Sequence, residues 1–226
     1  MMTAMFSWFM SRVAILVYAS EWLGVQRQLH HLRLELKSMK EFERPPHILQ
    51  AMLVSGEDHR FYSHYGIDLI AVCRALWRTL ACRRREGAST VEMQLVRVLT
   101  GHYEKSLSRK CKEVFLAILL SKSVPKAEIA SLYLFVAYYG TGMEGFVRAI
   151  CKLHIQQCVM TKRQAASLAA RLKYPEPKSM SDRRRHQINS RTEDLMLRYA
   201  KYFDGKRSQR LIRQESYATI SSPQHP

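Results

Sequence analysis

The sequence predicts an all-α fold, and three observations support this class. Beyond residue 46, apolar side chains recur at intervals of three and four positions, which is the period of a helix with one buried face. No segment alternates apolar and polar residues as a half-buried strand does. Hydrophobic residues make up 47% and charged residues 24% of the 226-residue chain, the balance of one folded domain with a sizeable core.

Eight helices are expected in this region, with ends defined to within about 2 to 4 residues. Segments 89–92 and 161–164 have the spacing of capping boxes, with Ser89 and Thr161 as the caps. Pro125 suits a first helical turn, and Gly140 and Gly205 suit helix ends. The expected helices cover residues 47–55, 68–84, 90–100, 107–122, 126–138, 144–154, 162–172 and 182–203.

The N-terminal segment, residues 1–43, is open to three interpretations. Its first twenty residues are apolar, but Arg12 interrupts them, and the basic residues follow the apolar run rather than precede it as in an ordinary anchor. The segment is therefore a truncated membrane anchor, a helix lying in the membrane interface, or an ordinary amphipathic first helix. The domain itself is expected over residues 44–205, and residues 206–226 are expected to form a flexible polar tail.

The charge balance is strongly basic, since 36 Lys and Arg against 19 Asp and Glu give a formal net charge of +17. Such a charge favours a polyanionic partner, which could be nucleic acid, anionic lipid or a phosphorylated substrate. The basic residues are dispersed and no nucleic-acid recognition motif is present, so we expect no nucleic-acid binding. The five cysteines lack zinc-site spacing and are expected to be buried thiols: Cys73, Cys82, Cys111, Cys151 and Cys158.

Two adjacent carboxylates, Glu57 and Asp58, follow the first expected helix of the domain, with His59 and His64 close behind. A carboxylate at a helix end can serve as a general base when partial burial makes protonation accessible. The simpler interpretation is a solvated helix end. A metal site built from these four residues is a third possibility, although the one-face pairing of an H-E-x-x-H site is absent.

Four segments in series carry a resemblance to a known family. Residues 57–66 read E-D-H-R-F-Y-S-H-Y-G, residues 87–97 read G-A-S-T-V-E-M-Q-L-V-R, residues 109–113 read R-K-C-K-E, and residues 126–135 read K-A-E-I-A-S-L-Y-L-F. They resemble the motifs E-D-x-x-F-x-x-H-x-G, G-A-S-T-I-T-Q-Q-L-x-K, R-K-x-x-E and K-x-E-I-L-E-x-Y-L-N of the peptidoglycan glycosyltransferases. The likeness covers about residues 44–200 in order, and it implies a lysozyme-like helical domain.

The resemblance implies an enzyme that polymerises lipid II into β-1,4-linked glycan with inversion and release of polyprenyl diphosphate. It implies Glu57 as the general base and Glu113 as a second catalytic carboxylate. Arg97, Arg109 and Lys110 would stabilise the leaving diphosphate, and Glu113 lies one helical turn from Arg109, where it could hold that arginine. The substrate-binding residues that it implies are Asp58, Phe61, His64, Gly66, Ser89, Thr90, Gln94, Arg97, Arg109 and Lys110.

The resemblance also implies partners and a location. The partners are lipid II, the growing glycan, an anionic membrane surface and other proteins of cell-wall synthesis, at the outer, periplasmic face of a bacterial cytoplasmic membrane. Residues 69–85, apolar with Trp77 and ending in three arginines, correspond to the part of the family that touches the membrane, although a core helix with a basic end fits equally. No cofactor is implied with certainty, and a Mg²⁺ or Mn²⁺ ion at the diphosphate stays open.

At five positions a polar group that is usual in the family is lost or altered. Each departure changes a group that is expected near the cleft, so the site could be remodelled. The alternative function is therefore an inactive protein that binds lipid II or glycan on the same fold. The departures are Glu92 for Thr, Met93 for Gln, Val98 for Asn, Ser131 for Glu and Phe135 for Asn.

Overall fold

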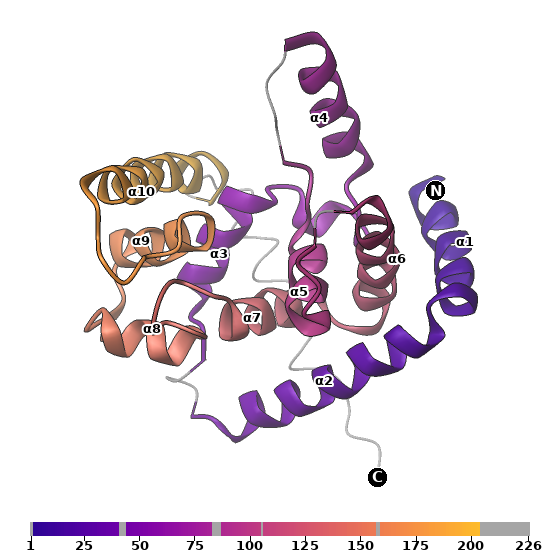
Figure 1. The fold of residues 1–226 in the computed structure, drawn as a ribbon, viewed down its shortest axis with the longest axis horizontal. Coiled ribbons are helices and arrows are strands. Elements are labelled where there is room, and N and C mark those ends of the chain that lie inside the picture. The colour runs from indigo at the N-terminus through magenta and orange to yellow at the C-terminus, as the bar shows by residue number, and fades with distance from the viewer. Residues whose placement is uncertain (1, 41–43, 83–86, 105, 157–158, 204–226) are drawn as a thin grey trace.

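The computed structural model describes residues 2–40, 44–82, 87–104, 106–156 and 159–203. Helices make up its regular structure (Figure 1). The β-type pairing within these residues is limited to two isolated bridges, from Tyr138 to Glu144 and from Gly140 to Glu176. The all-α prediction is confirmed.

In chain order the elements are α1 (Met2–Val17), α2 (Ala19–Ser38), α3 (His47–Glu57), the short 3-10 helix η2 (Phe61–Ser63), α4 (Leu69–Cys82), α5 (Val91–Thr100), α6 (Leu107–Ser123), α7 (Lys126–Val136), α8 (Phe146–Lys152), α9 (Lys162–Lys173) and α10 (Asp182–Phe203). The eight helices expected beyond residue 46 are all present, and their described ends agree with the predicted ends to within two residues. The helix end expected at residue 84 lies outside the described residues.

One helix cap was predicted correctly and another was not. Thr161 forms the expected capping box with Gln164 at the start of α9. The cap of α5 is Thr90 rather than Ser89, since the Thr90 side chain accepts a hydrogen bond from the amide of Met93. Glu92, which was expected to complete the box, is fully buried and forms an ion pair with Lys126. The helix end expected at residue 205 lies outside the described residues.

Helix α3 is the centre of the core. Its sequence is apolar around most of its circumference, as suits a helix that is buried on several sides. It packs against α7, α9 and α10, and Leu49, Met52 and Leu53 have at most 1% of their surface exposed. Because α3 ends at Glu57, the core fixes the position of that carboxylate.

The N-terminal helices pack on this body. Helix α1 lies against α6, and α2 crosses α5 and α7 along one edge of the molecule (Figure 1). On α2, Trp22, Val25 and Leu29 are buried, and Arg33 binds both carboxylate oxygens of Glu128 at 2.5 and 2.8 Å. Within the part of the chain that is described, no helix has both the length and the apolar character needed to span a bilayer.

Helix α4 projects away from the other helices (Figure 1). Its Leu76, Trp77 and Leu80 are 57%, 70% and 81% exposed. Leu76 and Leu80 also line an apolar cavity of about 390 Å³ beneath α4, together with Met93 and Lys110. The interpretation of α4 as an ordinary core helix is therefore wrong.

The cysteines correct another expectation. Cys73, Cys111 and Cys151 are free thiols on exposed faces of their helices, so they are not buried as predicted. The side chain of Cys82 and the whole of Cys158 lie outside the described part of the chain.

Candidate active site

Glu57 is held at the C-terminal end of α3 by two neighbouring helices. Its Oε1 atom accepts a hydrogen bond from Nη2 of Arg191 on α10 at 2.9 Å. Its Oε2 atom has a longer contact, 3.5 Å, with the amide nitrogen of Gln94 on α5. A hollow beside Glu57 is lined by His59, Arg74 and residues 87–90, so Ser89 and Thr90 border it, and their contact with a substrate stays a prediction.

Asp58, Phe61, His64 and Gly66 form the buried frame of the loop that follows α3. Asp58 accepts hydrogen bonds from the backbone amide of Val91, at 3.3 Å, and contacts Nε2 of His64 at 3.0 Å. Asp58, Phe61 and His64 are at most 7% exposed. They hold the loop against α5, and direct contact between them and a substrate stays a prediction.

Gly66 has a specific steric reason to be glycine. Its φ is +82°, and a Cβ atom there would lie 2.3 Å from the carbonyl oxygen of Ala117. Its own carbonyl accepts a hydrogen bond from the Thr90 hydroxyl at 2.8 Å. The loop and the start of α5 are therefore fixed to each other and to α6.

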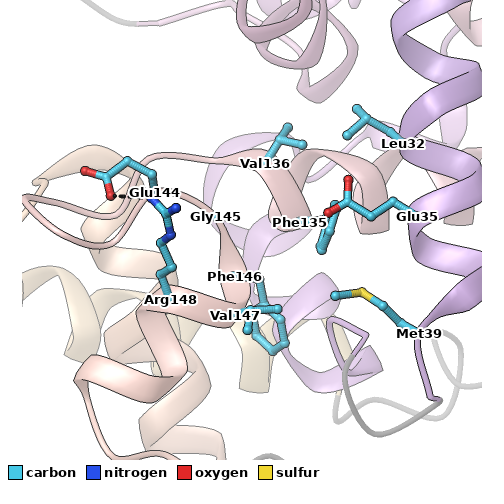
Figure 2. Close-up of a pocket in the computed structure, with 10 residues that line it drawn as sticks. All are labelled: Leu32, Glu35, Met39, Phe135, Val136, Glu144, Gly145, Phe146, Val147 and Arg148. Atoms are coloured by element: carbon cyan, nitrogen blue, oxygen red, sulfur yellow. Dashed lines mark hydrogen bonds and ion pairs between the residues drawn. The ribbon is translucent and has the colours of Figure 1, made fainter.

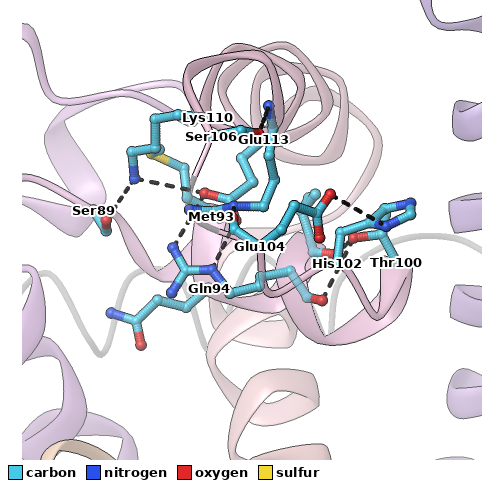
Figure 3. A network of polar contacts seen from close by, with 12 residues as sticks. Ser89, Met93, Gln94, Thr100, His102, Glu104, Ser106, Lys110 and Glu113 are labelled. Carbon is cyan, nitrogen blue, oxygen red and sulfur yellow. Dashed lines mark hydrogen bonds and ion pairs between the residues drawn. The ribbon is translucent and has the colours of Figure 1, made fainter.

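Three cations surround the single carboxylate of Glu113 (Figure 3). Arg97 on α5 binds both of its oxygens, at 2.7 and 3.1 Å, Arg109 forms a further ion pair, and the Lys110 ammonium lies 3.5 Å away. Lys110 also donates to the Ser89 hydroxyl at 2.7 Å. With three cations against one anion, the cluster has a local charge of about +2 and suits a phosphate group.

The electrostatics of this cluster keep Glu113 charged. Burial raises its pKa, but the hydrogen bonds of Arg97 and the charges of Arg97, Lys110 and Arg109 lower the pKa overall below its ordinary value. Hydrogen bonding to Glu113 raises the pKa of Arg97. Burial lowers the pKa of Lys110, and the charge of Glu113 counteracts part of that effect. The carboxylate is thus a fixed anion that orders the cations.

Helix α5 joins the two parts of the site. Gln94 contacts Glu57, and Arg97, three residues further along, contacts Glu113. Residues three apart lie on the same face of a helix, about 5 to 6 Å apart at their Cβ atoms. Tyr133 on α7 donates to Gln94 at 2.6 Å and so orients the amide that faces Glu57. The carboxylate and the cations therefore border one region of the molecule.

The four candidate metal ligands named from the sequence are not brought together in the structure. Glu57 pairs with Arg191, and the ring of His59 stacks on Tyr202, so the four residues considered from sequence do not form one group. A different group, Asp58, His64 and Glu92, has one possible ligand atom from each residue within 4.8 Å of the others. Glu92 in that group already forms an ion pair with the Lys126 ammonium, so its negative charge is balanced without a metal ion.

The departures from the family motifs fall outside the contacts of Glu57 and Glu113. Phe135 lines a separate cavity of about 530 Å³ between α2 and the segment that leads into α8, where it faces Leu32 and Met39 (Figure 2). Met93 lines the apolar cavity under α4, and Val98 packs against the core. The polar groups that contact the two carboxylates, on Gln94, Arg97, Arg109, Lys110 and Arg191, are all present.

Arg191 is the site residue that the sequence interpretation missed. It is 8% exposed on α10, and its partner Glu57 lies 134 positions away. One signal could have found it. Ile188, Arg191 and Leu195 recur at the three- and four-residue spacing of the buried face of α10, a spacing that would place this arginine inward, where a guanidinium needs a carboxylate partner.

The comparisons with known proteins identify the family of the chain. The family model described as Transglycosylase matches residues 26–200. Monofunctional glycosyltransferases of Staphylococcus aureus strains JH9, Newman and COL are each 30% identical over 185 residues, which is 78% of this chain and 66% of theirs. The chain thus spans just under two thirds of the length of these relatives. The match over most of its residues shows that the chain belongs to the transglycosylase family.

Proposed function

We propose that this protein is a peptidoglycan glycosyltransferase that polymerises lipid II. The observation that carries the proposal is the arrangement on α5, which presents Gln94 to Glu57 and, one turn later, Arg97 to the cluster around Glu113. A proton acceptor and a diphosphate-binding cluster are the two groups that transfer of a glycosyl unit from a lipid diphosphate requires. The family and the names of its relatives support the same reaction.

The reaction proceeds by direct displacement. The 4-hydroxyl oxygen of one lipid-linked disaccharide attacks the anomeric carbon of the growing glycan, its proton passes to Glu57, and the bond from that carbon to the diphosphate oxygen breaks. One displacement at an α-linked donor gives a β-1,4 bond with inversion. Negative charge develops on the departing polyprenyl diphosphate, where Arg97, Arg109 and Lys110 stabilise the transition state more than the ground state.

A divalent cation is not needed as a protein-bound group in this proposal. Glu113, the carboxylate in the cationic cluster, has both oxygens occupied by Arg97, so it does not fit the role of a ligand for Mg²⁺ or Mn²⁺. We derive no step through such an ion. Charge neutralisation at the diphosphate is assigned to the arginines and the lysine.

We further propose that the protein acts at the outer face of a bacterial cytoplasmic membrane. Two features support contact with a membrane surface: the exposed apolar side chains of α4 and a net charge of +17, which attracts anionic headgroups. The outer face is what the resemblance to the family implies. Lipid II is an amphiphile, so its diphosphate has to be reached from the membrane surface. The growing glycan and other proteins of cell-wall synthesis are the further partners of this proposal.

The experiment that tests the function uses the full chain with purified lipid II. We expect a glycan polymer, its digestion by a muramidase that cleaves β-1,4 bonds, and release of one polyprenyl diphosphate for each bond formed. If the chain binds lipid II but forms no polymer with or without Mg²⁺ or Mn²⁺, the protein is the inactive binding protein of the alternative interpretation.

A further inference from the structure

The two oxygens of the Glu57 carboxylate have different surroundings. Oε1 is 2.9 Å from Nη2 of Arg191, which also donates to the carbonyl oxygen of Gly56 at 2.8 Å. Oε2 meets a neutral amide, that of Gln94, at the longer distance of 3.5 Å. A carboxylate oxygen that already accepts a short, charge-assisted hydrogen bond is the poorer proton acceptor of the two.

Arg191 is itself fixed from its other side. Its Nη1 atom donates to Oδ2 of Asp194 at 2.5 Å, and Nε of Arg198 donates to Oδ1 of the same carboxylate at 2.8 Å. Arg191 thus bridges from α10 to the last turn of α3 with three hydrogen-bond acceptors. A planar guanidinium can hold such a geometry, whereas a lysine ammonium cannot reproduce it.

The close approach of α10 to α3 depends on Gly56. A Cβ atom at position 56 would lie 2.2 Å from Cδ2 of Leu195 and 3.1 Å from Nη2 of Arg191. The absence of a side chain at the residue before Glu57 therefore lets the guanidinium reach both the Gly56 carbonyl and the carboxylate. Side chains on α5 and α10 then approach Glu57 from different directions.

From this geometry we infer that Arg191 is a positioning residue for the reaction and that Oε2 of Glu57 is the atom that takes the proton. Arg191 holds Oε1 and so turns Oε2 toward α5, the helix that carries Arg97 and the diphosphate-binding cluster. Arg191 acts through Glu57 and does not itself contact the reacting atoms. The inference rests on the proposed function.

The test is steady-state polymerisation of lipid II by Arg191→Gln and Arg191→Lys. Misplacing a reacting group by about 1 Å can lower the rate about 100-fold, so we expect kcat of Arg191→Gln to fall by roughly that factor, with KM within about twofold. Arg191→Lys retains the charge and should recover part of kcat. The matched control is Arg163→Gln, which removes an ion pair to α10 through an arginine side chain that is 70% exposed, and it should leave kcat unchanged.

A second readout separates positioning from a purely structural role. In a Glu57→Gln background the carboxylate is absent, so adding Arg191→Gln should lower the residual rate less than about threefold. An equal loss in both backgrounds, a rise in KM that accounts for the loss, or unchanged kcat in Arg191→Gln overturns the inference. If Arg191→Gln fails to fold, Arg191→Lys takes its place in the test. A lower kcat with KM within about twofold then supports the inference, and an unchanged kcat overturns it. Absence of polymer with the wild type would instead count against the proposed function.

Discussion

At the scale of single residues, the two carboxylates that the motifs single out have different environments. Glu57 shares one oxygen with Arg191 and turns the other toward a neutral amide. Glu113 is 2% exposed, lies among three cations and stays ionised. The surroundings of Glu57 therefore fit the proposed role of proton acceptor, while Glu113 fits a fixed anion that keeps the cations in place.

Replacing Glu113 tests that assignment through stability. Its pKa in the folded state is below the ordinary 4.5, so its ionised form stabilises the fold above pH 4.5, and this contribution is lost as the pH falls further. We expect Glu113→Gln to lower the free energy of unfolding by about 2 to 3 kcal/mol at pH 7, less than for a fully buried pair because Arg97 and Lys110 are partly exposed. Thermal unfolding from pH 7 to pH 3 measures it. If the difference in free energy of unfolding between the wild type and Glu113→Gln does not shrink below pH 4.5, the assignment is contradicted.

The resemblance implied Glu57, Gln94, Arg97 and the cations near Glu113 as site residues. The structure brings Gln94 to Glu57 and the three cations to Glu113, and their roles in the reaction stay predictions. Arg191 was not predicted, since its partner is far away in the sequence and α10 carries other arginines that are exposed. The position of Phe135 was also misjudged. Phe135 lies two positions after Tyr133, which contacts Gln94, and residues two apart on a helix point to different sides, so Phe135 faces α2.

At the scale of helices, the sequence predicted the elements beyond residue 46 closely, because apolar periodicity and end signals agreed. The start of α5 was the exception. Ser89 and Thr90 can both cap a helix, and tertiary contacts decide: Lys110 binds the Ser89 hydroxyl, while Thr90 reaches Gly66 and the amide of Met93. Composition did not decide among the three interpretations of the segment that forms α1 and α2, because a membrane segment and a packed helix have similar apolar content.

Two leucines of α2 test whether this helix is part of the domain. Leu29 is 4% exposed and packs in the core, while Leu34 on the same helix is 52% exposed. Leu29→Ala should lower the free energy of unfolding by about 3 kcal/mol, and Leu34→Ala by less than about 0.5 kcal/mol. Urea denaturation of both variants gives the comparison. Equal and small effects would show that α2 is not packed as the structure has it.

At the scale of the whole molecule, charge and exposed apolar surface act together. In the proposed membrane contact, the net charge of +17 would attract anionic headgroups, and the projecting helix α4 would present its exposed Trp77 and Leu80 to lipid. The apolar cavity under α4 adjoins Lys110 of the cationic cluster. The diphosphate-binding groups thus lie near the part of the molecule that is proposed to meet the membrane.

Vesicle binding tests this orientation. Trp77→Ser should weaken binding to anionic vesicles about tenfold, as expected for roughly 60 Å² of apolar surface at about 25 cal/mol per Å². Leu197→Ser, on α10, removes a side chain of similar exposure, 73% against 70%, and should change binding less than about twofold. Co-sedimentation at low and high salt separates the apolar contribution to vesicle binding from the electrostatic contribution. Equal loss in the two variants would remove α4 from the proposed membrane contact.

The central claim is that the carboxylate at the end of α3 takes the proton from the attacking hydroxyl. Single-turnover coupling of lipid II by Glu57→Gln tests it most directly, with Glu193→Gln, an exposed carboxylate of α10, as the control. General-base catalysis contributes about 10²- to 10⁴-fold, so we predict a loss of at least about 100-fold for Glu57→Gln, unchanged lipid II binding and full activity of the control. A coupling rate for Glu57→Gln within about threefold of the wild type would contradict the claim.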